Sequence, residues 1–196
     1  MNKKRDELEE KFGFSFQNLP DECITWLTCD LKIRTDYVRR KIPDLPSCPC
    51  SYPINAIVNP DYELHDPIRN ESFKWREAAD VIENYGRDSY GVGKCVRTLA
   101  WYSDPRNLAS RVCCYDNDLA LITRGGAAGG YELVSPDRNS EYNEKLDYMP
   151  YVICKMDWRA VQTQIQPNNE QKCSENPDDE TYKAQVKKLE ESFSRI

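Results

Sequence analysis

Thiols are the most chemically distinctive side chains in this chain of 196 residues. The nine cysteines are Cys23, Cys29, Cys48, Cys50, Cys95, Cys113, Cys114, Cys154 and Cys173. Such a density is typical of a disulfide framework formed in an oxidising compartment. We therefore expect at least three disulfides. Because nine is an odd number, one cysteine should be unpaired or bridged to another chain.

The local spacing of the cysteines favours disulfides over a structural zinc site, which typically uses Cys-x2–4-Cys pairs. The close pairs here are Cys23-x5-Cys29, Cys48-Pro49-Cys50 and Cys113-Cys114. Adjacent residues on a strand point to opposite faces, so Cys113 and Cys114 should pair with different partners. Pro49 holds its segment extended, which makes Cys48 and Cys50 separate anchors. The pairing itself stays open, and we expect neither a metal nor another cofactor.

Residues that could support catalysis are few. The single histidine, His65, lies between Pro60 and Pro67, where a solvent-facing loop residue is expected. A Cys–His nucleophilic pair would need a free cysteine nearby, whereas most thiols here should be oxidised. The acids Asp178 and Asp179 fit the negative charge that a helix N-terminus favours. We therefore predict no catalytic residues and no enzymatic activity.

Charge and hydropathy argue against two classes of partner. The net charge of −6 argues against nucleic acid, and no apolar stretch reaches the roughly 18 residues of a membrane span. Residues 1–7 are mostly charged and lack the apolar core of a signal peptide. We expect an excised part of a secreted, extracellular precursor. The alternative is a cytosolic protein with many reduced thiols.

Several segments have helical patterns. Residues 1–19 form a charged, partly helical lead, and Pro20-Asp21 should begin a helix that runs towards residue 38. A shorter helix is predicted over 95–103. A final amphipathic helix over 177–196 carries apolar residues at heptad spacing, namely Tyr182, Val186, Leu189, Phe193 and Ile196. Because two heptads are marginal alone, docking on the domain's own surface is favoured over a coiled coil.

Strands and loops are predicted between these helices. Prolines make the segment 43–67 mostly irregular, held by Cys48 and Cys50. Residues 113–123 alternate around a polar turn, which predicts a β-hairpin, and residues 148–155 are expected to form a strand broken at Pro150. The glycines of 125–130 predict a flexible loop, but they lack the Lys and Ser/Thr of a phosphate-binding loop.

The order of several motifs resembles the AMOP domain, an adhesion-associated extracellular module. The motifs are WLTC at 26–29, PDLPSCPCSYP at 43–53, FKWREA at 73–78, VCCYD at 112–116, LITRG at 121–125, ICK at 153–155, DW at 157–158 and PNNEQKC at 167–173. Within this family, the chain is similar to isthmins, secreted proteins in which a thrombospondin type 1 repeat precedes a C-terminal AMOP domain. The resemblance covers about residues 22–180. It implies a secreted, disulfide-bonded ligand in adhesion, vascular or developmental signalling.

Integrin binding is one function that the resemblance implies, but two substitutions argue against it. Isthmins are described as engaging integrins through Arg-Lys-Asp or Lys-Gly-Asp tripeptides. The corresponding positions here hold Asn70-Glu71-Ser72 and Lys155-Met156-Asp157. Methionine restricts a turn that glycine would allow. We therefore do not predict an integrin partner. A basic patch of Arg34, Arg39, Arg40 and Lys41 could bind glycosaminoglycans, and the competing interpretation is a solvated helix face.

The expected partner-binding surface combines residues 51–77 with the loop 124–131, because loops on a rigid scaffold commonly carry function. Five side chains have the size and polar reach of hot spots, namely Tyr52, Tyr62, Trp75, Arg76 and Arg124. Trp75 fits a core position equally well. Asn70-Glu71-Ser72 is also an N-glycosylation sequon, which predicts a glycan on Asn70.

Together these observations predict a small disulfide-rich α+β domain with short helices, a β-hairpin and long irregular loops. We divide the chain into a charged lead or linker (1–19), an AMOP-like domain (20–176) and a C-terminal helix (177–196). The expected function is an extracellular module that binds a cell-surface receptor or matrix protein. A structural spacer that presents a neighbouring repeat and a cysteine-dependent enzyme are the competing classes.

Overall fold

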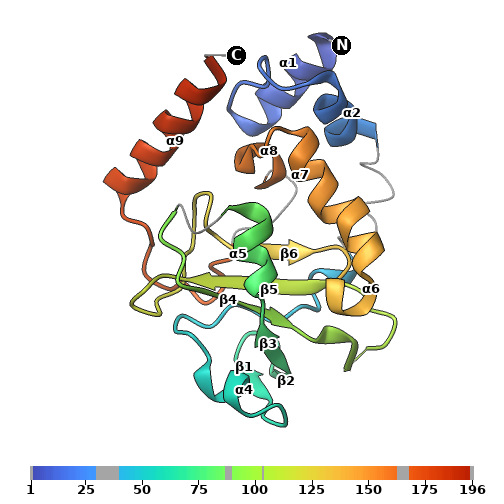
Figure 1. Ribbon diagram of the computed structural model, residues 1–196, viewed down its shortest axis with the longest axis vertical. Coiled ribbons are helices and arrows are strands. Elements are labelled where there is room, and N and C mark those ends of the chain that lie inside the picture. Colours follow the sequence, from blue (N-terminus) through green and yellow to red (C-terminus); the bar gives the residue numbers. More distant parts are fainter. Residues whose placement is uncertain (1, 30–39, 87–89, 103, 163–167, 195–196) are drawn as a thin grey trace.

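The computed structural model describes residues 2–29, 40–86, 90–102, 104–162 and 168–194 (Figure 1). Helices and strands mix in this part of the chain, which confirms the predicted α+β class. A small sheet occupies the middle of the molecule, helices gather at one end, and a short hairpin with one helix forms the other end.

The central sheet has four antiparallel strands in the order β3-β4-β5-β6. They are β3 (Trp75–Glu77), β4 (Lys94–Thr98), β5 (Ser110–Tyr115) and β6 (Gly130–Glu132). All six residues of β5 are buried, so both faces of this strand contact other parts of the chain. Cys95 and Val96 on β4 pair with Cys114 and Cys113 on β5.

The helix predicted over 95–103 is wrong, because β4 covers its first half and only Ala100–Tyr102 form a short 3₁₀ turn, η2. Residues 95–98 are buried on both faces of the sheet. The strand therefore lacks the polar alternation that marks a half-buried strand.

One end of the molecule consists of helix α4 (Ile54–Val58) and the antiparallel hairpin of β1 (Leu64–Asp66) and β2 (Glu71–Phe73). This part is the lower end in Figure 1. The prediction of a mostly irregular segment over 43–67 therefore misses one short helix and one short strand. Each is only three to five residues long, and propensity rarely identifies elements of that length.

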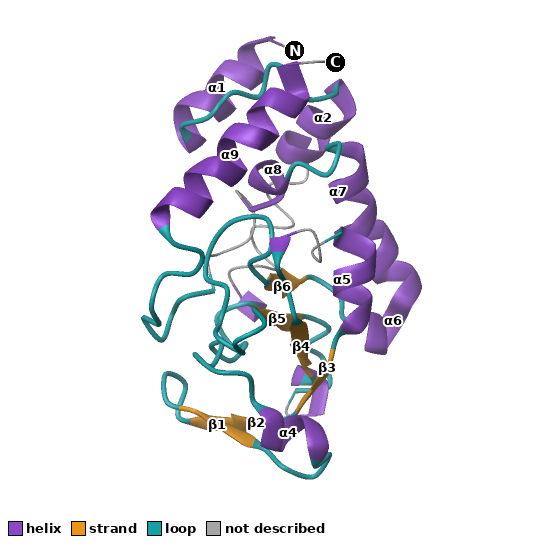
Figure 2. Cartoon of the chain, turned by 60° about the vertical axis from the view of Figure 1, so that its left-hand side comes forward, coloured by secondary structure: helices purple, strands orange, loops and turns teal. Residues whose placement is uncertain are grey.

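Helix α5 (Ala79–Tyr85) lies beside the sheet (Figure 2). A nearly continuous helical run also lies there and consists of α6 (Pro136–Asn143), the π-helical turn η3 (Glu144–Tyr148) and α7 (Met149–Ile153). The strand predicted over 148–155 is wrong, because Pro150 lies in the first turn of α7, where its missing N–H costs nothing. The Asp147 carboxylate fixes the run by accepting hydrogen bonds from the backbone N–H groups of Leu133 and Val134 at 2.8 and 3.1 Å.

The opposite end is helical and contains α1 (Asn2–Phe12), α2 (Asp21–Cys29), α8 (Trp158–Gln162) and α9 (Asp179–Ser194) (Figures 1 and 2). Leu8, Phe16 and Phe193 are buried there around the Cys23–Cys154 disulfide. The predicted helix at the C-terminus is confirmed, and it docks on the domain's own surface. The helix predicted to begin at Pro20-Asp21 is confirmed as far as residue 29; its continuation and Ile196 lie outside the described residues.

The loops around β5 are more ordered than the sequence indicates. A short hairpin is present, with Tyr115 bridged to Leu121 and the Asp116 N–H donating to the Ala120 carbonyl. The glycine-rich segment 125–130 was expected to be flexible but is mostly buried. A Cβ atom on Gly129 would lie 2.1 Å from the Val112 carbonyl oxygen, so glycine is required there for close backbone approach rather than for mobility.

Candidate functional site

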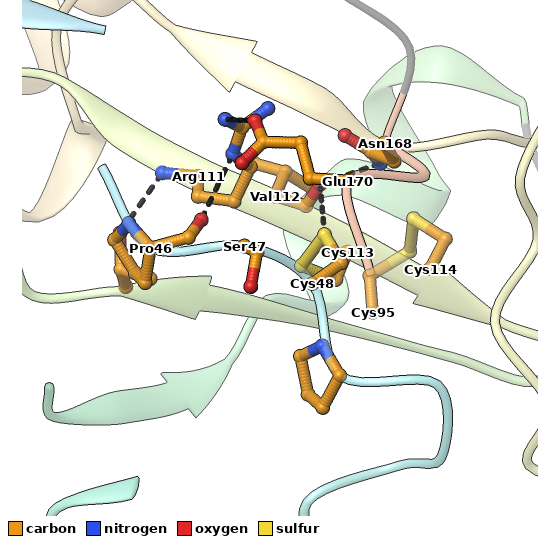
Figure 3. Close-up of a disulfide and its surroundings, with 12 residues drawn as sticks. Pro46, Ser47, Cys48, Cys95, Arg111, Val112, Cys113, Cys114, Asn168 and Glu170 are labelled. Atoms are coloured by element: carbon orange, nitrogen blue, oxygen red, sulfur yellow. Dashed lines mark hydrogen bonds and ion pairs between the residues drawn. A yellow bond between two sulfur atoms is a disulfide. The ribbon is translucent and has the colours of Figure 1, made fainter. Parts of the chain in front are cut away.

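Four disulfides crosslink the described part of the chain, three of them around the sheet and one at the helical end. They join Cys23 to Cys154, Cys48 to Cys113, Cys50 to Cys173 and Cys95 to Cys114. Cys113 and Cys114 take part in different clusters on the two faces of β5 and bind different partners, as expected for adjacent strand residues (Figure 3). These bonds use eight cysteines, and the side chain of Cys29 lies outside the described residues.

The late segment 168–173 locks the loop 46–50 onto β5 (Figure 3). The Asn168 side-chain amide donates to the Val112 carbonyl at 3.0 Å. The Glu170 carboxylate accepts from Arg111 at 2.8 Å, and Gln171 donates to the Ser47 hydroxyl at 2.8 Å. The described part of the PNNEQKC motif, residues 168–173, is therefore a structural clamp that positions Cys173 for its disulfide with Cys50.

A buried ionic network supports the other side of the sheet. Arg97 is 1% exposed and donates to the carboxylates of Glu132, at 2.6 and 2.7 Å, and of Asp80, at 2.7 and 3.1 Å. Burial alone would lower the pKa of Arg97, but the charges and hydrogen bonds of Glu132 and Asp80 outweigh it and raise that pKa. Burial raises the pKa of Glu132, although Arg97 and the Ser110 hydroxyl oppose the shift.

The five side chains expected to bind a partner are not brought together. Tyr52 and Trp75 are buried at 8% and 4% exposure in one apolar cluster with Tyr115, which favours a packing role for both. Arg124 faces the C-terminal segment, where it donates to the Pro177 carbonyl at 2.9 Å and forms ion pairs with Glu175 and Asp179. The loop 124–131 is therefore mainly an internal contact.

The other two expected residues are accessible. Arg76 is half exposed and pairs with Asp137, beside a cavity of about 460 Å³ lined by polar side chains of β3, α5 and α6. Tyr62 is 40% exposed and follows α4. Of the five residues, only Tyr62 belongs to an exposed group of apolar and aromatic side chains at one end of the molecule.

That group is the candidate site. It consists of Ile54 (55% exposed), Val58 (71%), Tyr62 (40%) and Ile68 (55%), and we call it the tip. All four residues lie on α4, in the loop after it or in the turn of the β1–β2 hairpin, at the lower end of Figure 1.

Helix α4 explains why the tip is apolar. Its inner residues Ala56 and Ile57 pack into the cluster around Tyr115. Its outer residues Ile54 and Val58 are one turn apart and share the opposite face, which stays exposed. Surface helices normally carry polar residues on that face, so the outer face is available for a further apolar contact.

The tip is held rigidly on the crosslinked sheet. Asp66, 3% exposed at the end of β1, accepts hydrogen bonds from the Ser47 N–H at 2.8 Å and the Ser47 hydroxyl at 2.7 Å. Its carboxylate also accepts from the Ile68 N–H at 2.9 Å, which shapes the hairpin turn. Ser47 precedes Cys48, so the tip is connected directly to the Cys48–Cys113 disulfide. A preorganised surface of this kind loses little conformational entropy on binding.

Asn70, the residue of the sequon, lies in the same hairpin turn. It is exposed and has a φ of 55°, a left-handed conformation that asparagine tolerates better than most residues. The next residues, Glu71 and Ser72, are exposed on β2, where Ser72 pairs with His65. The acceptor side chain is thus accessible at the end of a short hairpin.

Two other predicted features have different surroundings. In the tripeptide Lys155-Met156-Asp157, the Asp157 carboxylate is fully buried and accepts from Arg159. In the basic patch, Lys41 pairs with Asp104 at 2.8 Å, whereas Arg34 and Arg39 lie outside the described residues.

Three tip residues, Ile54, Val58 and Ile68, were missed by the sequence analysis. The signal that could have found them is the run Ile54–Val58, in which four of five residues are apolar. A helix so short cannot bury all of its faces. Among the described residues, no group of three or more His, Cys, Asp or Glu side chains could hold a metal ion. No described helix is long and apolar enough to cross a membrane.

The fold and the crosslinks define a class: a small α+β domain held by disulfides, with an exposed apolar surface and, among the described residues, no group of side chains that could hold a metal ion. The family model of the AMOP domain matches residues 19–177, which is most of the chain. The chain therefore belongs to the AMOP domain family, whose members are extracellular and associated with adhesion. No solved structure matches it.

Proposed function

We propose that this chain is the binding module of a secreted, isthmin-like adhesion or signalling protein. It binds a cell-surface receptor or matrix protein through the tip, and it has no enzymatic activity. The observation that carries the proposal is the outer face of α4, where Ile54 and Val58 are exposed on a helix fixed to a disulfide-bonded sheet.

The composition of the tip indicates what kind of partner fits it. The exposed acids Asp61 and Glu63 in its loop and Glu71 on β2 lie beside the apolar residues, and Arg69 is already paired with Asp66 and Glu170. A partner with an apolar pocket and basic residues at its rim would complement this surface. The burial of Asp157 supports a partner other than an integrin that reads the Lys155–Asp157 tripeptide.

Two further parts of the proposal concern export and modification. The AMOP match and the four disulfides support passage through an oxidising secretory route. Asn70 is proposed to carry an N-linked glycan on that route. A glycan there would shield Ile68 in the same turn, so we assign the partner contact to α4 and Tyr62.

Cell binding by matched variants tests the proposal. The wild-type chain, V58E and L146E are secreted behind a signal sequence, and their binding to cells and to deposited matrix is titrated. Leu146 is 45% exposed on η3, away from the tip, so it provides a control for a new surface charge. We expect V58E to lower the affinity by about tenfold or more, as for a central hot spot, and L146E to bind like the wild type.

The outcomes separate the competing functions. Equal binding by wild type and an I54E/V58E variant would contradict the tip assignment. If the secreted, correctly disulfide-bonded wild type bound neither cells nor matrix, the spacer function would replace the binding function. N70Q should lose the mass of one glycan without losing secretion, and an unchanged mass would refute the glycan alone.

A further inference from the structure

Tyr62 is presented on a tight turn at the edge of the tip. The Tyr62 N–H donates to the Asn59 carbonyl at 3.0 Å, and the Asn59 side-chain oxygen accepts from the Asp61 N–H at 3.1 Å. These two bonds fix the backbone on the N-terminal side of Tyr62. The phenol is 40% exposed, and its hydroxyl has no hydrogen-bond partner among the described residues.

Two acids flank this tyrosine directly in the sequence. Asp61 and Glu63 are both exposed, and neither carboxylate joins an ion pair or hydrogen bond within the described part of the chain. No Lys or Arg occurs within five positions on either side of Tyr62. The phenol therefore lies in a local field of uncompensated negative charge.

We propose that Tyr62 is a site of O-sulfation. A transferase that binds a polyanionic sulfo-nucleotide has a basic active site, and such a site attracts an exposed tyrosine between free carboxylates. In the reaction, the bond from the donor's sulfur to its phosphate oxygen breaks and a bond from sulfur to the Tyr62 Oη forms. The phenolic proton passes to a base of the transferase, so no oxidant or reductant is needed.

The modification deepens the proposed function and rests on its secretory route. A sulfate ester adds a permanent negative charge and several hydrogen-bond acceptors to a surface that already carries Asp61 and Glu63. Arginine recognises such anions with paired, charge-assisted hydrogen bonds. Sulfated Tyr62 would thus strengthen binding to a partner whose rim is basic.

Tyr142 provides an internal control. It is 53% exposed and follows an acid, Glu141. However, Glu141 pairs with Lys145 at 2.5 Å, Arg138 lies four residues earlier, and the backbone is part of α6. The nearby negative charge is therefore offset and the segment cannot easily extend into an active site. We expect Tyr142 to stay unmodified.

The test uses the full chain secreted from cultured cells, with the reduced tryptic peptides 42–69, which contains Tyr62, and 139–145, which contains Tyr142, analysed by mass spectrometry and by radioactive sulfate labelling. We expect the mass of one SO₃ group on Tyr62, none on Tyr52 in the same peptide, and none on Tyr142. Y62F should lose all label from this peptide, D61N/E63Q should lose most of it, and Y142F should keep it. A second assay incubates the purified, disulfide-bonded chain with a tyrosine sulfotransferase and its phosphoadenosine phosphosulfate donor.

Each of the following results supports or overturns the proposal that Tyr62 is sulfated. Secretion with an unmodified Tyr62, a phosphate in place of sulfate, or label on Tyr142 instead would overturn the sulfation proposal and leave the binding function standing. Retention of the chain inside cells, together with transfer of sulfate to Tyr62 in the purified assay, would support the sulfation chemistry and count against the extracellular function.

Discussion

Around the sheet, three disulfides hold loops and short strands in place, whereas at the helical end a single disulfide, Cys23–Cys154, joins packed helices. The helices there bury apolar side chains from both ends of the chain, including Leu8 and Phe193. Apolar clusters also cover both faces of the sheet, and the disulfides there hold the loops and short strands around it in addition to this packing. The surface proposed for recognition is therefore held both by crosslinks and by the packing of Ala56 and Ile57 beneath it.

Selective removal of disulfides should have the largest effect. Replacing Cys23 and Cys154 with serine, or Cys48 and Cys113, should each lower the free energy of unfolding by about 2–5 kcal/mol. Hydrogen exchange should then show loss of protection at the helical end in the first variant and around α4 and β1 in the second. The same pattern of lost protection in both variants would contradict the predicted difference between the helical end and the sheet end.

The buried network under the sheet should be the next most sensitive feature. E132Q removes one charge beside Arg97, which is 1% exposed, and should cost about 3–5 kcal/mol. The matched control is E141Q, which removes the exposed ion pair between Glu141 and Lys145. This substitution should lower the free energy of unfolding by at most about 1 kcal/mol. Denaturant unfolding measures both values, and equal effects would show that the Arg97 network is not important for the sheet.

The role of the chain ends can be tested with F193A. Phe193 is 8% exposed in the cluster with Leu8 and Phe16, although it lies beyond the residues that the AMOP model matches. We expect a loss of about 3 kcal/mol, with exchange protection lost mainly in α1, α2 and α9. Unchanged stability would mean that α9 does not belong to the helical core.

The smallest predicted effect concerns acid stability. The hydrogen bond from Lys41 lowers the pKa of Asp104 to about 2, with a further contribution from the Arg106 N–H. A lowered pKa stabilises the folded state above the unfolded value of about 3.9, and this contribution disappears as the pH falls towards the folded value. D104N should therefore be slightly less stable than wild type at neutral pH, and in thermal melts this difference should shrink as the pH falls to about 2, where half of the Asp104 carboxyls of the folded state are protonated. A difference that is as large at about pH 2 as at neutral pH would contradict this assignment.

The sequence predicted the crosslinked α+β class, the different partners of Cys113 and Cys114, and the final helix, because each depends on local spacing. It failed where tertiary contacts decide. Residues 95–98 form a strand that is buried on both faces, and residues 149–153 form a helix whose first turn accommodates Pro150. No local pattern distinguishes these cases.

The candidate site shows the same limit. The segment 51–77 was predicted to be part of the partner-binding surface, and Tyr62 in this segment is exposed. The sequence could not distinguish exposed from buried aromatic residues, so Tyr52 and Trp75 were grouped with it. Arg124 forms ion pairs within the molecule because the late segment 175–179 folds back beside it. The spacing of residues along the sequence does not reveal this contact.

A disulfide map of the secreted chain tests the central claim most directly, because the rigidity of the tip depends on which segments are crosslinked. Non-reducing digestion followed by mass spectrometry should recover four linked pairs, Cys23–Cys154, Cys48–Cys113, Cys50–Cys173 and Cys95–Cys114. A bond between Cys48 and Cys50, or free thiols at Cys113 and Cys173, would contradict the account, since α4 and the β1–β2 hairpin would then be detached from the sheet.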